Sequence, residues 1–476
     1  MNIKKGTQLT LKIQSAGAQG MGVARTAEGQ VVFVPFGIPG DLVEVTVVKS
    51  KKKFLEAQID KILKPSPARI PPKCSHFGTC GGCKWQHMDY EAQLAHKKAE
   101  VTSNLKHLGG LQLPEPDQIL GCSEIFGYRN KVEFSFSSMR WLSEAEVAST
   151  YALDRRALGF HIPGRWDKVL HIDYCHLHDA YSNEIRNFIF KYAVEHNLTF
   201  WNPREQRGLL RTLMLRISTT GQYLVLIQFG EDNQRDIHSL LSRLLEAFPK
   251  IFTLIYAVNI KGNDAIYDLD LHTFSGPGYI EEKLKAYNEG DPDLIFRVSP
   301  KSFYQTNSLQ AERLYRRVLD YLQPVGNENI YDLYTGTGTI ALYMARYVKS
   351  VTGIELVPDA ITDAHINAEL NGIRNVDFIV GDMKTAFSED FISHYGHPDV
   401  VVVDPPRDGM HPAVASQLVR LKPQRIIYVS CNSATQARDI ALMKDHYTIE
   451  RYGPVDMFPH THHIENVALL KATHSI

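Results

Sequence analysis

The stretch Tyr428-Val429-Ser430-Cys431-Asn432 closes an apolar run that begins at Ile426. An apolar run that stops abruptly is typical of a buried strand in a parallel sheet, and such sheets bind ligands at the carboxyl ends of their strands. We therefore expect Cys431 to stand at the rim of a site. The alternative is an inert thiol that packs as a small hydrophobe, which is a common fate of a free cysteine.

The sequence around this stretch alternates short apolar runs with helical patterns from about residue 298 to residue 476. The predicted strands are Asn329–Leu333, Ser350–Glu355, Val376–Val380, Val400–Asp404 and Arg425–Ser430, and the predicted helices are Ile340–Tyr347, Asp359–Asn371 and Pro412–Arg420. This alternation predicts a doubly wound, Rossmann-like α/β domain with parallel strands. Cys431 would then share a sheet edge with the residues that follow the other strands.

Two further regions precede this domain, as the length of 476 residues suggests. Residues 1–62 alternate apolar and polar positions between glycine-rich turns, which predicts a small β-barrel of the OB type, a fold often used on single-stranded RNA. A proline-rich linker at 64–72 leads into residues 63–297, where mixed strand and helix patterns predict an α+β domain. The helix predicted in the segment 91–119 is expected to pack on the C-terminal domain.

The bulk composition is that of an ordinary globular protein, with 44% hydrophobic and 22% charged residues. Because the net charge is −1, any surface for nucleic acid must be local, and the lysine-rich run 49–53 is one candidate. Six cysteines are too few for a secreted disulfide scaffold of this length. No run approaches the length of a bilayer span, and the N-terminus lacks an apolar signal region. We therefore expect a cytoplasmic protein without a membrane partner.

A glycine loop, Asp332-Leu333-Tyr334-Thr335-Gly336-Thr337-Gly338, follows the first strand of the α/β domain and opens a helix. Glycines let the backbone approach a ligand, and an acidic residue after the next strand, here Glu355, can hold ribose hydroxyls. Both a nicotinamide dinucleotide and S-adenosylmethionine fit this pattern, and Ala341, where a dinucleotide loop has its third glycine or alanine, does not separate them. Asp332 and Asp382 favour S-adenosylmethionine, whose amino group and adenine need acceptors.

The fourth predicted strand ends in Asp404-Pro405-Pro406-Arg407. Because each proline fixes φ, this turn would form a rigid wall beside the cofactor. The alternative is an ordinary β-turn. Adenine- and cytosine-amino methyltransferases carry a similar acidic-Pro-Pro-aromatic loop. Arg407 replaces the aromatic residue, which favours contact with a phosphate or a carbonyl over stacking on an amino-bearing base.

Glu465 lies between Ile464 and Val467 at the start of a predicted strand. A partly buried carboxylate has a raised pKa and can accept a proton near neutrality. A plain surface glutamate fits the same pattern equally well. Three histidines just before it could suggest a metal site, but the adjacent pair His462 and His463 should point in different directions.

Four cysteines have a spacing typical of a metal centre. Cys74, Cys80 and Cys83 lie close together in a glycine-containing loop, and Cys175 follows far downstream. Four thiolates in a reducing cytosol suit either a zinc ion or an iron–sulfur cluster, and the spacing does not separate these two. Unpaired buried thiols are the remaining alternative.

Taken together, these motifs resemble those of the S-adenosylmethionine-dependent 5-methyluridine methyltransferases of RNA, over nearly the whole chain. The matching segments are Ser299–Asn307, Asp332–Gly338, Asp404–Arg407, Val429–Asn432 and His460–Glu465. The chain looks most similar to the 23S rRNA branch, whose members carry a TRAM-type barrel and a 4Fe–4S cluster. The resemblance implies a TRAM barrel at 1–62, a central RNA-binding domain with the cluster loop at 63–297 and a methyltransferase domain at 298–476.

The resemblance also implies roles for single residues. Cys431 would be the nucleophile and Glu465 the proton acceptor. The residues implied to contact S-adenosylmethionine are Gln305, Tyr334, Glu355 and Asp404, and those implied to hold the 4Fe–4S cluster are Cys74, Cys80, Cys83 and Cys175. The thiolate would add to carbon 6 of uracil, so that carbon 5 can attack the methyl group before the base removes its proton. The target uracil must be unpaired or flipped out of its stack.

RNA is therefore the expected partner, with 23S rRNA as the expected substrate and tRNA as the alternative. A non-catalytic RNA-binding or RNA-folding factor would also explain the barrel and the lysine run. The intact Cys431, Glu465 and cofactor motifs argue against that alternative.

Overall fold

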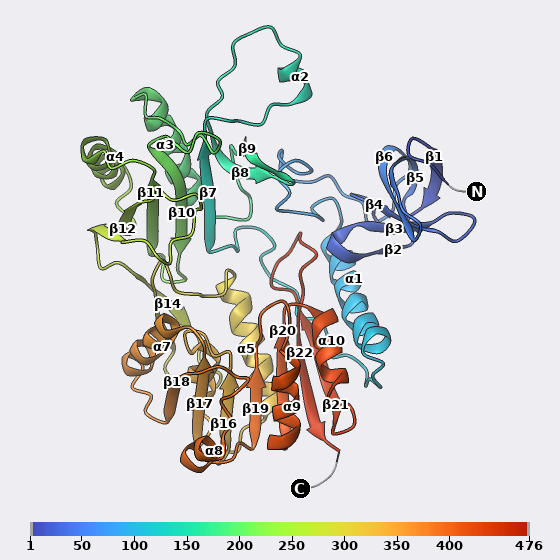
Figure 1. Ribbon diagram of the computed structural model, residues 1–476, viewed down its shortest axis with the longest axis vertical. Helices are drawn as coiled ribbons and strands as arrows, with labels where there is room; N and C mark the ends of the chain where they lie inside the picture. The colour runs from blue at the N-terminus through green and yellow to red at the C-terminus, as the bar shows by residue number, and fades with distance from the viewer. Residues whose placement is uncertain (1–2, 474–476) are drawn as a thin grey trace.

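The computed structural model describes residues 3–473, and Figure 1 shows how its parts are arranged. An N-terminal barrel projects from one side of the molecule, and helix α1 lies between this barrel and the C-terminal unit. The central and C-terminal units, each built on a sheet, are stacked one above the other. None of the helices in the described range has both the length and the hydrophobicity that a bilayer crossing requires.

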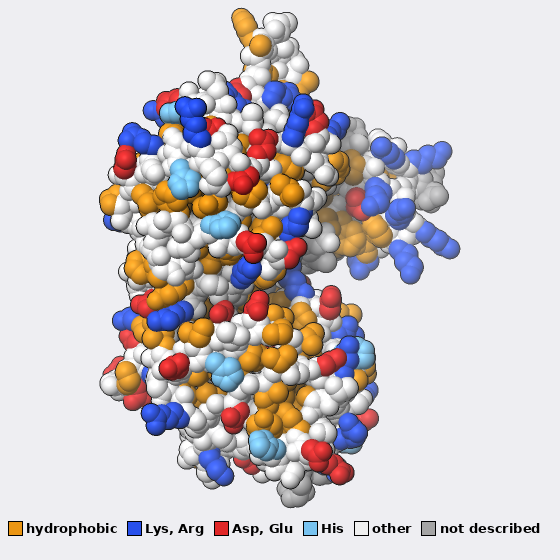
Figure 2. Space-filling model, turned by 60° about the vertical axis from the view of Figure 1, so that its left-hand side comes forward, with side chains coloured by type: hydrophobic (Ala, Val, Ile, Leu, Met, Phe, Trp, Pro, Cys, Tyr) orange, Lys and Arg blue, Asp and Glu red, His pale blue; other side chains and the backbone are white. Residues whose placement is uncertain are grey.

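The N-terminal barrel closes because its first two strands, which are consecutive in the chain, stand at the two ends of the strand order. Strand β1 pairs with β5, and β2, which follows β1 almost directly, pairs with β3. The strands are β1 (Gln8–Lys12), β2 (Ser15–Ala16), β3 (Gly22–Arg25), β4 (Val31–Val34), β5 (Leu42–Ser50) and β6 (Phe54–Lys64). Val43, Val45 and Val47 of β5 point inward together, as the strand period of two requires. The predicted barrel is confirmed, and Figure 2 shows Lys and Arg side chains spread over its outer surface.

Helix α1 (Tyr90–Ser103) and the π-helical turn η2 (Asn104–Leu108) pack on the C-terminal unit. The ammonium group of Lys97 is fully buried in this contact and lies 2.6 Å from the carboxylate of Asp456. The helix does not fill the expected segment, because a glycine pair and two prolines interrupt the helical pattern after Leu108. Residues 109–119 instead run without regular secondary structure along the C-terminal unit.

The central unit is a sheet with the strand order β13-β12-β11-β10-β7-β8-β9 and with α3 and α4 on one face. Its elements are β7 (Lys131–Ser137), α2 (Glu144–Val147), β8 (Ala157–Ile162), β9 (Arg165–His171), α3 (Ala180–Glu195), β10 (Leu210–Ile217), β11 (Tyr223–Phe229), α4 (Gln234–Ala247), β12 (Ile251–Val258) and β13 (His272–Ser275). Side chains of β10 alternate between the two faces: Leu213 and Leu215 pack under the helices, whereas Met214 packs toward the C-terminal unit. The loop with α2 projects from the molecule, as Figure 1 shows.

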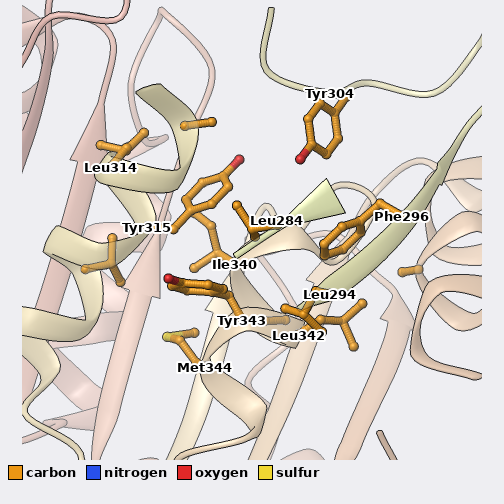
Figure 3. Close-up of a cluster of buried hydrophobic side chains, with 14 of the residues drawn as sticks. Leu284, Leu294, Phe296, Tyr304, Leu314, Tyr315, Ile340, Leu342, Tyr343 and Met344 are labelled. Carbon is orange, nitrogen blue, oxygen red and sulfur yellow. The ribbon is translucent and has the colours of Figure 1, made fainter. Parts of the chain in front are cut away.

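The apolar core of the C-terminal unit continues into the central one. A hairpin of β14 (Ile280–Leu284) and β15 (Leu294–Val298) leads from one unit to the other. Figure 3 shows Leu284 and Phe296 of this hairpin beside Tyr315 and Ile340, which come from the first two helices of the C-terminal unit. Because one buried cluster spans both units, packing fixes their relative placement.

The C-terminal unit is a sheet with the strand order β18-β17-β16-β19-β20-β22-β21 and helices on both faces. Its elements are α5 (Ser308–Leu322), β16 (Asn329–Leu333), α6 (Thr339–Ala345), β17 (Ser350–Glu355), α7 (Pro358–Leu370), β18 (Val376–Val380), α8 (Glu389–Tyr395), β19 (Val400–Val403), α9 (Pro412–Leu421), β20 (Arg425–Ser430), α10 (Ser433–Ala441), β21 (Tyr447–Val455) and β22 (Glu465–Ala472). The predicted Rossmann-like class is confirmed. The expectation of parallel strands alone was incomplete, because β22 runs antiparallel to β20, and β21 antiparallel to β22.

Candidate active site

The antiparallel pair β20 and β22 brings Cys431 and Glu465 to the same place on the sheet edge. Ser430, the last residue of β20, pairs with Asn466 of β22. One residue further along this register, the chain reaches Cys431 on one strand and Glu465 on the other. The thiol is half-buried, whereas Glu465 is only 5% exposed. A thiol and a carboxyl group thus lie side by side although 33 residues lie between them in the sequence.

The carboxyl groups at this edge are strongly perturbed. Burial, reinforced by Asp404, raises the pKa of Glu465 to about 8, although Arg407 acts in the opposite direction. Burial likewise raises the pKa of Asp404 to about 7, and the carboxyl group of Asp332 adds to this shift. Such groups exchange protons near neutral pH, which is what a catalytic acid or base requires.

The Cys431 thiol shares this environment. Burial, followed by the nearby carboxyl groups of Glu465 and Asp404, raises the pKa of Cys431 to about 11. Arg407 opposes this rise through its positive charge. The guanidinium is therefore the group at the site that stabilises a thiolate.

Arg407 is held where it can act on the thiol. Its backbone carbonyl accepts hydrogen bonds from the side-chain amide of Asn432 (3.0 Å) and from the hydroxyl of Thr435 (3.2 Å). Its guanidinium Nη2 lies 3.2 Å from Nδ1 of His463. Asn432 therefore ties the proline turn after β19 to the residues that follow Cys431.

The glycine loop lies at the same edge of the sheet, after β16. Tyr334 adopts a positive φ of 64° and its N–H donates to the carbonyl of Ile354 (3.0 Å). The N–H of Gly336 donates to a carboxylate oxygen of Glu355 at 3.2 Å. A side chain at Gly338 would meet the ring of Phe378 at 2.7 Å, so this glycine is required by packing as well as by its φ of +77°.

Glu355 has one carboxylate oxygen committed to its own loop. Its Oε1 accepts the N–H groups of Leu356 and Val357 at 2.8 and 3.0 Å, which fixes the orientation of the carboxylate. The segment before α5 lies against the same glycine loop, since the Thr337 hydroxyl donates to the carbonyl of Phe303 (3.3 Å). Gln305, two residues further, is anchored through its carbonyl by the side chain of Asn130 (2.9 Å). All four candidate cofactor-contacting residues thus belong to segments at one sheet edge.

Asp382, which the sequence pattern included, is differently placed. It follows β18, is exposed, and its carboxylate accepts the N–H of Lys384 at 2.9 Å within its own turn. Its position at the end of a parallel strand still places it along the same edge as the glycine loop.

The four cysteines of the predicted metal centre line one cavity of about 580 Å³. The thiol of Cys83 accepts a hydrogen bond from Gln86 at 3.2 Å, and the N–H of Cys175 donates to Asn183 at 2.8 Å. Arg407 and His463 line the same cavity, so it reaches the active-site edge. Among residues 3–473, no three His, Cys, Asp or Glu side chains converge closely enough to hold one metal ion. Cys122 lies apart from the cavity, with its thiol 3.1 Å from the carbonyl of Asp456.

The loop that leads into Glu465 has contacts that sequence reasoning missed. The carbonyl of His460 accepts hydrogen bonds from the N–H groups of Lys84 (2.8 Å) and Trp85 (2.9 Å), directly after the third clustered cysteine. The hydroxyl of Tyr128 donates to the carbonyl of Pro459 at 3.0 Å. His460 itself is buried against the ring of Phe126. Because these are contacts between distant segments, no local pattern could have predicted them.

Comparison with known proteins places this site in a family. A family model described as tRNA (uracil-5-)-methyltransferase matches residues 274–473, and a TRAM domain model matches residues 3–59. The chain is 46% identical to an uncharacterized RNA methyltransferase of Bacteroides thetaiotaomicron, over 95% of this chain and 99% of that protein. It is 47% identical to another from Porphyromonas gingivalis, over 97% of this chain and 99% of that one.

A solved structure supports the same assignment. The Pyrococcus abyssi tRNA (uracil-54, C5)-methyltransferase in complex with S-adenosyl-L-homocysteine is 29% identical and matches with a TM-score of 0.74. The match covers 97% of this chain and all of that one. The chain belongs to the S-adenosylmethionine-dependent RNA (uracil-C5)-methyltransferase family, and it carries an N-terminal TRAM domain.

Proposed function

We propose that this enzyme methylates carbon 5 of a uridine in 23S rRNA through a covalent adduct between Cys431 and carbon 6 of uracil. The observation that carries the proposal is the pairing of Cys431 with Glu465 beside Arg407, at the edge where the glycine loop ends. A thiol, a carboxyl group and a cation are the groups that this chemistry requires.

In this proposal the Cys431 thiol gives its proton to solvent, and the thiolate then forms a bond from its sulfur to carbon 6. The electron pair of the carbon 5–carbon 6 bond moves toward the carbonyl at carbon 4. Carbon 5 then takes the methyl group as the bond from that group to the sulfonium sulfur breaks, which leaves S-adenosylhomocysteine as the neutral product. Glu465 accepts the proton that carbon 5 still carries, the double bond re-forms, and the thiolate leaves. Arg407 stabilises the thiolate, both before it adds to carbon 6 and after it leaves, because the positive charge of its guanidinium acts on the sulfur.

S-adenosylmethionine supplies an electrophilic methyl group on a cationic sulfur. We assign its binding to Gln305, Tyr334, Glu355 and Asp404, whose segments meet at the sheet edge. The backbone N–H groups of Leu356 and Val357 orient the Glu355 carboxylate and hold it for ribose hydroxyls. The buried Asp404 offers an acceptor close to Cys431.

The 4Fe–4S cluster is assigned to Cys74, Cys80, Cys83 and Cys175. Four thiols around one cavity fit such a group, which holds its iron through cysteine thiolates. A zinc ion held by the same four thiolates is the alternative, because zinc also binds four cysteines. Anaerobic purification should give a brown protein with iron and sulfide in equal amounts. A colourless protein with stoichiometric zinc would overturn this assignment.

Trapping with fluorinated RNA tests the adduct. We expect 23S rRNA that contains 5-fluorouridine to become covalently attached to Cys431 in the presence of S-adenosylmethionine, since carbon 5 then has no proton for Glu465 to remove. Cys431→Ala should form no adduct, and methylation by this variant would refute the mechanism. Cys122→Ala is the matched control, because that thiol lies outside the cavity and hydrogen-bonds a backbone carbonyl.

A tRNA substrate is the second candidate, because the similar Pyrococcus abyssi enzyme is named for uracil 54 of tRNA. Mapping 5-methyluridine in the rRNA and tRNA of a deletion strain separates the two. Loss of 5-methyluridine from 23S rRNA supports the rRNA substrate. Loss of 5-methyluridine from tRNA alone replaces it with the tRNA substrate.

A further inference from the structure

A second cavity, of about 800 Å³, opens on the central unit away from the active-site edge. Its wall includes Trp166, which follows the tight turn between β8 and β9 and is 66% exposed. An exposed tryptophan at a pocket mouth is unusual, because burial of this side chain normally stabilises the fold. Its position indicates a ligand with a flat apolar face.

The polar side chains on the floor of this pocket already have partners within the protein. The guanidinium of Arg211 lies 4.2 Å from the ring centroid of Trp201, and its Nε donates to Asp264 at 2.8 Å. Both Trp201 and Arg211 are buried. They shape the pocket, which leaves Trp166 and the exposed polar side chains of Gln206 and His161 to meet a ligand.

Basic side chains lie in the pocket and beside it, and of these Arg204 lines the pocket. Asp167 accepts hydrogen bonds from Arg204 (2.6 Å) and Arg165 (3.3 Å), so one carboxylate serves two guanidinium groups. Arg155 and Lys168, which lie outside the pocket lining, add two more cations near Arg204, and neither has an acidic partner within salt-bridge distance in the described range. After burial, these neighbouring arginines are the main cause that lowers the pKa of Lys168. An aromatic plane with surplus cations around it fits an unpaired nucleotide.

The two cavities share a wall residue. His161 of β8 lines both this pocket and the cysteine-lined cavity that ends at Arg407. The pocket with Trp166 therefore adjoins the cavity that reaches Arg407.

We propose that this pocket binds an unpaired nucleotide of the RNA substrate, with its base stacked on Trp166 and its phosphate at Arg204, Arg165 and Lys168. The site selects RNAs that present a second single-stranded nucleotide at a distance from the target uridine. This inference rests on the proposed function for its substrate, but the pocket can be tested without methylation.

Direct binding of a short labelled oligouridylate, followed by fluorescence anisotropy, is the first test. Trp166→Ala should weaken binding about tenfold, as expected for one stacked base, and Trp166→Phe should restore most of the affinity. Tyr151→Ala is the matched control, since this aromatic side chain is 83% exposed outside the pocket. The double variant Arg155→Gln/Lys168→Gln should reduce the slope of log Kd against log salt by about one to two.

Methylation kinetics on unmodified 23S rRNA are the second test. Trp166→Ala should raise KM about tenfold and leave kcat unchanged, because the side chain never reaches the reacting atoms. Wild-type affinity and KM in both Trp166→Ala and the double variant would overturn the inference. If the wild-type enzyme methylates no RNA, the proposed function fails, while the oligouridylate titration still decides on the pocket.

Discussion

Replacing Glu465 by Gln should make the protein more stable in alkaline solution while it removes the proposed base. Glu465 is nearly fully buried and has a pKa of about 8, against 4.5 in an unfolded chain. The folded state therefore binds the proton more tightly, and its stability falls as the pH rises from 4.5 through 8. Above that range, ionisation costs the folded protein about 5 kcal/mol relative to the unfolded chain. A neutral glutamine of the same shape carries no such cost.

Thermal unfolding of both proteins near pH 5 and near pH 9 measures this difference. We expect similar midpoints at the acidic pH, where Glu465 is protonated, and a higher midpoint for Glu465→Gln at the alkaline pH. Asp404 and Asp332 also have raised pKa values, so only the difference between variant and wild type reports on Glu465. Glu450→Gln, a change at an exposed carboxylate of β21, is the control. An equal effect of Glu465→Gln at both pH values would refute the reasoning.

Three further predictions follow from other contacts. Glu355→Ala should raise the Kd for S-adenosylmethionine more than tenfold, because a charged hydrogen-bond acceptor contributes about 1.5–3 kcal/mol to binding. Calorimetry measures this Kd, with Glu369→Ala at an exposed position of α7 as the control. An unchanged Kd would remove Glu355 from the binding site. Lys97→Met should lower the free energy of unfolding by about 3–5 kcal/mol, because it leaves Asp456 buried without its cation; denaturant titration tests this, and unchanged stability would contradict it. The turnover number of the wild-type enzyme should rise with pH up to about pH 8, because Glu465 must be ionised to accept a proton. A flat pH–rate profile over that range would contradict the role of Glu465 as the base.

The parallel strands of the C-terminal unit could be predicted closely because each is a short apolar run bounded by turn residues. The run from Val400 to Val403 is buried throughout, and its shortness, its β-branched residues and the prolines on either side favour a strand over a buried helix. The direction of β22 could not be predicted in the same way. Its residues are buried on both faces, so they show no alternation, and only pairing with β20 sets the antiparallel course.

The candidate site likewise has one part that the sequence could predict and one part that it could not. Glu355 and the glycine loop could be related from the sequence because a strand and a crossover fix their spacing. The neighbourhood of Cys431 and Glu465 depends on a hairpin that turns back across the sheet, and the sequence contains no spacing rule for that. Burial of the carboxyl group, which raises its pKa, likewise follows from the whole packed edge and not from its neighbours in the chain.

The loop between β21 and β22 links the distant cysteines to the position of Glu465. It begins at Asp456, which holds Lys97 of α1, and it ends at Glu465. Between them, the carbonyl of His460 accepts the N–H groups of Lys84 and Trp85, which follow the clustered cysteines. Any group that fixes the cysteine loop therefore also fixes the segment that delivers Glu465 to the sheet edge. The cavity lined by the cysteines and by Arg407 is consequently one structural unit with Cys431 and Glu465, although its residues come from distant parts of the chain.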